Sequence, residues 1–352
     1  MLIINGAYGE GGGQILRTSL ALAVILAQPI RIENIRAGRK NPGLAAQHLA
    51  SVRAAAKLCD AVLSGDQLGS TRLTFKPRRP STAGVYEFDV AAAREGGSAG
   101  AATLVLQTVL LPLACATGPS TVIIKGGTHV PWSPSFHYIQ NVYLPMLNLL
   151  ELQATVDLLA WGWYPAGEGR IRLETAGKAF ANMDLTAKEW VERGPLRQVK
   201  GIGVASSLPA HIAQRIADRA RNLLKQAGLP AEITPMRVQS VSPGAGLFLT
   251  AEYEASRAGF SSLGEKGKPS ERVAEEAVEQ FLAFHQSGAF ADEHLADQLI
   301  LPIALAGCPL TFSTSNLSQH TRTNIWVVEQ FFGPMVVVDQ EHNQIHFSGR
   351  NR

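Results

Sequence analysis

The sequence has few cysteines and little excess charge, and both shortages limit the classes of protein to which it can belong. Its three cysteines, Cys59, Cys115 and Cys308, are scattered and form no C-x-x-C pair. We therefore expect small buried residues in reducing surroundings rather than a disulfide framework. Charged residues make up 17% of the chain, and the net charge is only +3. A protein that coats long nucleic acid has a strong basic stripe, whereas this balance suits one that grips a single anionic end through a few arginines.

Long hydrophobic runs are also missing. The two longest apolar stretches, at 15–30 and 103–117, are too short to span a bilayer and contain Arg17 or Pro112. The first residues lack the basic and apolar regions of a signal peptide. We expect no contact with a membrane and a location in the cytoplasm.

The chain instead contains a threefold repeat. Each copy has an apolar helix that opens with Gln and closes before Pro, followed by a β-branched strand, and the three helices open at Gln14, Gln107 and Gln298. Proline cannot continue a helix, so its recurrence marks each helix end. Second helices are expected at 43–58, 135–150 and 318–332. We predict an α/β fold of three repeated lobes, each a sheet with two helices on one face.

The segment 185–288 does not follow the repeat. Strands are expected there at 199–206, 231–238 and 246–255, and helices at 211–226 and 270–285. We predict that residues 185–288 form a small inserted α/β domain. Residues 1–184 and 289–352 would then form the three-repeat catalytic domain.

Two loops carry residues suited to binding an anion. A glycine-rich loop at 6–14 precedes the first helix, where backbone N–H groups can approach a phosphate. Glycine content alone also fits a plain turn, but the embedded Glu10 indicates a metal or a basic partner. Arg17, Arg36 and Arg39 would converge on this loop if both loops lie at one end of the sheet, and arginine binds phosphate in a bidentate fork. A solvated basic loop is the alternative.

His320 is the candidate nucleophile. It begins a helix just after a strand, which is the usual place for ligand contacts in α/β sheets. A lone histidine is more often structural, but the polar neighbours Ser318, Thr321 and Asn324 argue against burial in an apolar core. A neutral imidazole can attack phosphorus and form a phosphoramidate. His48, which also follows a Gln, stands at the matching place of the first repeat.

Several motifs occur together and in order. They are GEGGGQILR at 9–17, IRAGRKNPG at 35–43, Gln47-His48, TLVLQ at 103–107, LADQ at 295–298 and the His320 helix. In this combination the sequence closely resembles the RNA 3′-terminal phosphate cyclase family, from about residue 5 to residue 338. The resemblance implies three repeated lobes with a small inserted domain. It also implies a ligase that closes a 2′,3′-cyclic phosphate on RNA ends, with ATP and a divalent metal, Mg²⁺ or Mn²⁺.

The resemblance further implies three chemical steps. His320 attacks the α-phosphate of ATP and releases pyrophosphate, giving an adenylylated enzyme. AMP then passes to the RNA 3′-phosphate. The neighbouring 2′-OH attacks the activated phosphate, expels AMP and closes the ring, and proximity accelerates this intramolecular step.

The remaining site residues are also implied by the resemblance, in three sets. The ATP set is Gln107, Pro131, His294, Leu295, Ala296, Asp297 and Gln298. The set for the RNA phosphate end is Arg17, Arg36, Arg39, Gln47 and His48, and Glu10 is placed near the metal. His294 is a departure, because the family often has a tyrosine there that stacks on adenine. RNA 3′-phosphate ends are the implied partner, and no obligate protein partner is evident.

Two other classes remain as alternatives. A non-catalytic relative that acts in ribosome assembly would keep the fold but lose the nucleophile, and His320 with its intact arginine set argues against it. An enolpyruvyl transferase shares the three-lobed plan but lacks the motif centred on a histidine.

Overall fold

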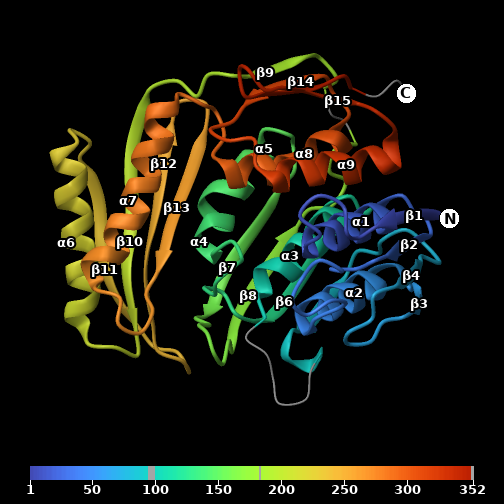
Figure 1. Cartoon of the computed structure of the whole chain (residues 1–352), viewed down its shortest axis with the longest axis horizontal. Coiled ribbons are helices and arrows are strands. Elements are labelled where there is room, and N and C mark those ends of the chain that lie inside the picture. Colours follow the sequence, from blue (N-terminus) through green and yellow to red (C-terminus); the bar gives the residue numbers. More distant parts are fainter. Residues whose placement is uncertain (94–99, 182–183, 350–352) are drawn as a thin grey trace.

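The computed structural model describes residues 1–93, 100–181 and 184–349. In these ranges the strands form four sheets of four strands each (Figure 1). Three sheets share one strand order and belong to three repeated lobes, whereas the fourth has a different order. The structure thus confirms the predicted α/β fold of repeated lobes.

Each lobe is built in the order β-α-β-α-β-β. The first contains β1 (Leu2–Asn5), α1 (Gly13–Ile25), β2 (Ile30–Glu33), α2 (Ala46–Cys59), β3 (Val62–Ser64) and β4 (Leu73–Lys76). The second contains β5 (Val85–Asp89), η1 (Ala91–Ala93), α3 (Ala102–Ala114), β6 (Ser120–Gly126), α4 (Phe136–Tyr138), the π-turn η2 (Ile139–Tyr143), α5 (Leu144–Asn148), β7 (Ala154–Ala160) and β8 (Gly169–Thr175). The third contains β9 (Lys188–Trp190), α8 (Glu293–Ala306), β14 (Leu310–Ser313), α9 (Gln319–Phe332), β15 (Val336–Asp339) and β16 (Gln344–Phe347).

Strand pairing is the same in all three lobes. The first strand runs parallel to the second, and the other pairs are antiparallel, which gives the orders β1-β2-β4-β3, β5-β6-β8-β7 and β9-β14-β16-β15. Every second residue of β6 is buried, so one face of its sheet packs inward, as the period of a strand requires. The sequence repeat is therefore a repeat of topology.

The fourth sheet is formed by the segment between β9 and α8. It contains β10 (Leu196–Ser206), β11 (Ala231–Val238), β12 (Gly244–Tyr253) and β13 (Arg257–Leu263), with the helices α6 (Ala210–Gln226) and α7 (Ser270–Ser287). These elements share an apolar cluster of their own. β9 lies within 185–288 but pairs with β14 of the third lobe. The insert thus separates the first strand of the third lobe from its first helix, and the domain division at 185 and 288 remains a prediction.

The first helix of each lobe contributes to one shared hydrophobic core. Most residues of α1, α3 and α8 are buried, as expected of helices that are largely apolar. One hydrophobic cluster contains residues of all three lobes. In the described ranges, no helix combines the length and the apolar character that crossing a membrane requires.

The predicted helix starts at Gln107 and Gln298 are wrong. α3 begins at Ala102 and α8 at Glu293, so both glutamines lie inside their helices. They line a polar cavity between the lobes. A polar residue within an apolar run indicated a helix boundary, but here it marks the part of the helix that faces this cavity.

A buried histidine, His129, and a partly buried one, His137, lie between the second lobe and the insert. His129 Nδ1 is 2.8 Å from Thr128 Oγ1, and its Nε2 is 2.9 Å from His137 Nδ1. The ring of His129 also packs against Trp163 and Phe248. Burial lowers the pKa of His137 to about 4 and that of His129 well below its ordinary value.

Because of these two histidines, we expect the free energy of unfolding to fall in acid. The unfolded chain takes up protons near pH 6.5, whereas the folded chain resists them. The stabilisation is therefore complete above about pH 6.5 and declines as the pH falls toward 4. Urea unfolding at pH 7.5, 6 and 5 measures this decline, and His137→Asn should make it shallower. An equally steep decline in that variant would show that His137 does not cause the loss of stability in acid.

Candidate active site

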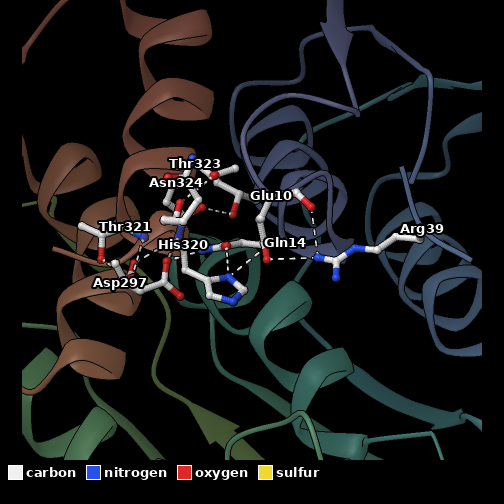
Figure 2. A network of polar contacts seen from close by, with 11 residues as sticks. Glu10, Gln14, Arg39, Asp297, His320, Thr321, Thr323 and Asn324 are labelled. Carbon is white, nitrogen blue, oxygen red and sulfur yellow. Dashed lines mark hydrogen bonds and ion pairs between the residues drawn. The ribbon is translucent and has the colours of Figure 1, made fainter. Parts of the chain in front are cut away.

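His320 lies in the first turn of α9 and faces the glycine-rich loop (Figure 2). Its Nδ1 is 2.7 Å from Gln14 Oε1 and 3.0 Å from Glu10 Oε1. Because both partners are acceptors, Nδ1 carries the proton and the lone pair of the neutral ring lies on Nε2. The side chain is 56% exposed, so this nitrogen can meet a substrate. The hydrogen bond with Glu10 raises the pKa of His320, and the charges of Glu10 and Asp297 add to this effect.

Glu10 is held between His320 and an arginine. Arg39 Nη2 donates to the backbone oxygen of Glu10 at 3.0 Å and lies 3.3 Å from its Oε2. Burial opposes ionisation of Glu10, but the hydrogen bond with His320 and the nearby positive charges outweigh it and lower the pKa of the carboxyl. Glu10 is therefore an anion that faces one imidazole and one guanidinium.

The glycines of the loop are required by close packing. A Cβ at Gly9, whose φ is +57°, would collide with Thr323 Oγ1 on α9. A Cβ at Gly12 would lie 2.5 Å from Glu10 Oε1. The loop is also fixed by Tyr8, whose ring stacks on Trp326 of α9 at 4.0 Å. The third lobe thus packs directly on the loop, and this contact brings His320 to Glu10.

A buried polar network lies behind His320. Gln14 bonds His320 through Oε1, and its Nε2 donates to Asp297 Oδ1. Asn324 Nδ2 donates to the same Asp297 oxygen at 2.7 Å, and Thr18 Oγ1 donates to Asn324 Oδ1 at 2.6 Å. Burial raises the pKa of Asp297 to about 6, although the charge of His320 opposes this shift. The network joins α1, α8 and α9.

Sequence reasoning did not assign Gln14, Thr18 or Asn324 to the site. Gln14 was recognisable as the Gln shared by the three repeats, but there it indicated a helix start. Of the predicted ATP residues, Asp297 belongs to this network, and Gln107 Nε2 donates to Gln298 Oε1 at 3.0 Å in the adjoining cavity.

The other predicted ATP residues lie on α8 and in the loop between β6 and α4. His294 is in the first turn of α8, mostly exposed, with its ring edge-on to Tyr138 at 6.4 Å. Pro131 is exposed in the loop between β6 and α4. Leu295 and Ala296 are fully buried in the core.

The predicted phosphate set gathers around the start of α1. A Cβ at Gly13 would collide with His48 Nε2 and would lie 3.0 Å from Arg17 Nη1. His48 Nδ1 accepts from the backbone N–H of Ala45 at 3.1 Å, so Nε2 carries the proton. Burial and the charge of Arg17 lower the pKa of His48 to about 3, which keeps it a neutral donor. Burial lowers the pKa of Arg17 to about 10, so Arg17 is still a cation at neutral pH.

Arg36 and Gln47 stand beside this group. Arg36 has a φ of +52° and donates to the carbonyl of Gly43 at 2.8 Å. Burial and the neighbouring charge of Arg39 lower its pKa. Gln47 lies half-buried in the first turn of α2. The structure therefore brings Arg17 of α1 and the two arginines of the loop after β2, Arg36 and Arg39, to one end of the first lobe, as the sequence predicted for a convergent set.

A divalent metal fits this site only if substrate phosphates supply most of its ligands. Among the described residues, no group of three or more His, Cys, Asp or Glu side chains could hold a metal ion. Glu10 offers a single carboxylate, and its two oxygens face His320 and Arg39. Mg²⁺ is commonly held by one or two carboxylates together with substrate phosphates. Glu10 fits that arrangement.

A histidine with one reactive nitrogen, surrounded by arginines, is suited to an enzyme that acts on phosphate groups. The comparison with known proteins gives the family. The family model described as RNA 3′-terminal phosphate cyclase matches residues 8–338, and the chain belongs to this family.

Relatives of the same name cover nearly the whole chain. The chain is 55% identical to the RNA 3′-terminal phosphate cyclase of Gloeothece citriformis over 331 residues, which is 94% of this chain and 93% of the relative. Identity to the protein of Methylococcus capsulatus is 53%, over 94% of this chain and 91% of the relative. Identity to the protein of Pyrococcus furiosus is 40%, over 96% of this chain and 95% of the relative.

Proposed function

We propose that this chain is an RNA 3′-terminal phosphate cyclase that uses ATP and His320 as its nucleophile. Family membership supports the ligase activity. The single observation that carries the role of His320 is the pair of contacts at Nδ1, to Gln14 and Glu10. They leave Nε2 to react.

In the first step, His320 Nε2 attacks the α-phosphorus of ATP. An N–P bond forms, the bond from the α-phosphorus to the bridging oxygen breaks, and pyrophosphate leaves with the electron pair. The ring gains positive charge as this happens. The carboxylate of Glu10, 3.0 Å from Nδ1, stabilises this positive charge. Because the charge develops mainly in the transition state, its stabilisation speeds the reaction.

The RNA enters in the second and third steps. An oxygen of its 3′-phosphate attacks the adenylate phosphorus, an anhydride forms, and the N–P bond breaks, which regenerates His320. The 2′-OH then attacks the phosphorus of the 3′-phosphate and its proton passes to solvent. The bond from this phosphorus to the anhydride oxygen breaks, and AMP leaves with the electron pair. Arg17, Arg39 and the Nε2–H of His48 are proposed to bind the RNA phosphate, since two are cations and the third is a neutral donor.

The metal would contribute charge neutralisation. A divalent cation held by Glu10 and by oxygens of the triphosphate would offset phosphate charge during binding. Glu10 then has two partners, His320 and the metal, and the Glu10→Gln variant distinguishes its effects on them.

The proposed activity can be tested with an RNA oligonucleotide whose 3′-phosphate is radioactively labelled. Incubation with the protein, ATP and MgCl₂ should make the label resistant to phosphatase, because a cyclic phosphodiester is no longer a monoester. Omitting ATP should leave it sensitive. Label that stays sensitive in the complete reaction would rule out the proposal.

We also propose that the enzyme acts in the cytoplasm, without an obligate protein partner. Cys59 and Cys308 are buried thiols, and burial raises the pKa of Cys59 to about 12, so it is an unreactive thiol of the kind common in reducing compartments. Activity of the pure protein, and its distribution after cell fractionation, test these two proposals.

Replacing Arg39 should separate the steps. Arg39 is 45% exposed, so its pair with Glu10 is weak, and Arg39→Ala should leave self-adenylylation largely in place. Transfer of AMP to RNA ending in 3′-phosphate should fall by about 10- to 100-fold, the loss of one charged hydrogen bond. Arg53→Ala, an exposed arginine of α2, is the control. Equal loss of both steps would mean that Arg39 serves ATP.

Replacing His294 tests the proposed adenine contact. Stacking on a base is worth on the order of 1–3 kcal/mol, and a phenol ring offers more area than imidazole. His294→Tyr should keep activity and tighten ATP binding by up to about tenfold. The measurement is the ATP dependence of adduct formation, with His211→Tyr, an exposed position on α6, as the control. Identical affinities in wild type and variant would place adenine elsewhere.

A further inference from the structure

A buried carboxylate at the start of α8 links three parts of the chain. Asp292 is 3% exposed. Its Oδ1 accepts from the backbone N–H of His294 at 2.9 Å and of Leu295 at 2.8 Å, which caps the helix. The same oxygen accepts from the Tyr138 hydroxyl at 2.9 Å, and Oδ2 accepts from the backbone N–H of Gly259 at 3.2 Å.

The partners of Asp292 come from different lobes. Tyr138 belongs to α4 of the second lobe, and Gly259 belongs to β13 of the insert. β13 approaches α4 so closely that a Cβ at Gly259 would lie 2.6 Å from Tyr138 Cδ2 and 2.8 Å from Val142 Cγ2. One carboxylate thus joins the second lobe, the third lobe and the insert, which also has an apolar cluster of its own.

The position of α8 matters for the active site. Asp297 lies one turn and a half after Asp292 on this helix, and it accepts from Gln14, which in turn holds His320. His294 is two residues from Asp292, and Gln298 is in the next turn. A change in the position of the helix start would therefore move the predicted nucleotide residues together.

We propose that Asp292 is a positioning residue for ATP, and that through Gly259 the inserted domain helps to hold the nucleotide-binding end of α8. The inference rests on the proposed function, because that function places ATP at α8. If ATP did not bind at α8, Asp292 would be only a helix cap. The two roles differ in the partners they need: a cap needs one oxygen, whereas the link to the insert needs the second.

Asp292→Asn separates the two roles. Asparagine caps a helix as well as aspartate does, so Oδ1 still serves α8. Its amide group replaces Oδ2 and turns a donor toward the Gly259 N–H, which loses its acceptor. Tyr138→Phe removes one donor and leaves the carboxylate. Arg219→Gln breaks an ion pair with Glu275 between α6 and α7, and so weakens the insert without touching α8.

The test is the initial rate of adduct formation by the full chain over a range of ATP concentrations. Asp292→Asn should raise KM for ATP about tenfold with little change in the maximal rate, since binding is lost without loss of chemistry. Tyr138→Phe should raise KM less. Arg219→Gln should lower the melting temperature and leave KM unchanged. An unchanged KM in folded Asp292→Asn would overturn the proposal.

Hydrogen exchange keeps this outcome distinct from failure of the proposed function. If the wild type forms no adduct, the proposed function fails. The link is then judged from the amide of Gly259 and those of α8, which should exchange faster in Asp292→Asn than in the wild type. Unchanged exchange at both places would overturn the link itself.

Discussion

Replacing His320 by alanine should abolish the transfer of labelled AMP from ATP to the protein. The nucleophile would be gone, and no neighbouring side chain could take its place at the same atom. The fold should survive, because the side chain is 56% exposed and Ser318 still caps α9. The measurement is retention of label after acid-free denaturing electrophoresis, with circular dichroism to confirm folding.

His342→Ala is the matched control for this experiment. His342 is also an exposed imidazole, paired with Asp339 on the third lobe at 2.8 Å. It lies in the turn between β15 and β16, outside the site. The control should take up label like the wild type. Uptake of label by folded His320→Ala would show that another residue is the nucleophile.

Glu10→Gln should slow adduct formation by on the order of 10²-fold, the scale of losing one positioned group that stabilises charge in the transition state. Glutamine keeps an oxygen for Nδ1–H but removes the charge that stabilises the developing imidazolium. The pKa of His320 is raised by its hydrogen bond with Glu10 and by the charge of Glu10; glutamine weakens the first effect and removes the second. The reaction needs the neutral ring, so its rate falls as the pH drops through the pKa of His320. In the variant this fall should occur at lower pH.

The metal concentration separates the two roles of Glu10. A pH profile measured at low and at high MgCl₂ gives both the maximal rate and the inflection. If Glu10 serves His320, the inflection moves in the variant and excess metal does not restore the rate. An unmoved inflection, with the rate restored by metal, would mean that Glu10 acts only as a metal ligand.

The fold was largely predictable because each repeat contains an apolar helix that ends before a proline, and this pattern can be recognised in the sequence. β11 occupies the predicted residues 231–238, and α9 begins within one residue of the prediction. The strands β1, β9 and β16 were missed because segments of three or four residues carry little periodicity. β13 was missed because small polar residues obscure its alternation.

Those site residues were predictable whose side chains have a chemistry that itself indicates a role in the reaction. His320, Glu10 and the arginines near the glycine loop are of this kind, and the structure brings them together. Gln14, Asn324 and Asp292 act through partners instead. Gln14 meets His320 across 306 residues of sequence, and Asp292 meets Gly259 across 33. Such pairs depend on how the lobes pack, which no local pattern in one sequence reveals.

The central claim is tested most directly by a pulse and chase of the covalent intermediate. The protein is incubated with ATP labelled in the α-phosphate, and the labelled peptide is identified after digestion. The adduct should be labile in acid and stable in base, as a phosphoramidate is, and it should map to His320. Addition of RNA with a 3′-phosphate should then release the label from the protein and yield AMP and a cyclic end. A label on another residue, or one that RNA does not discharge, would contradict the account.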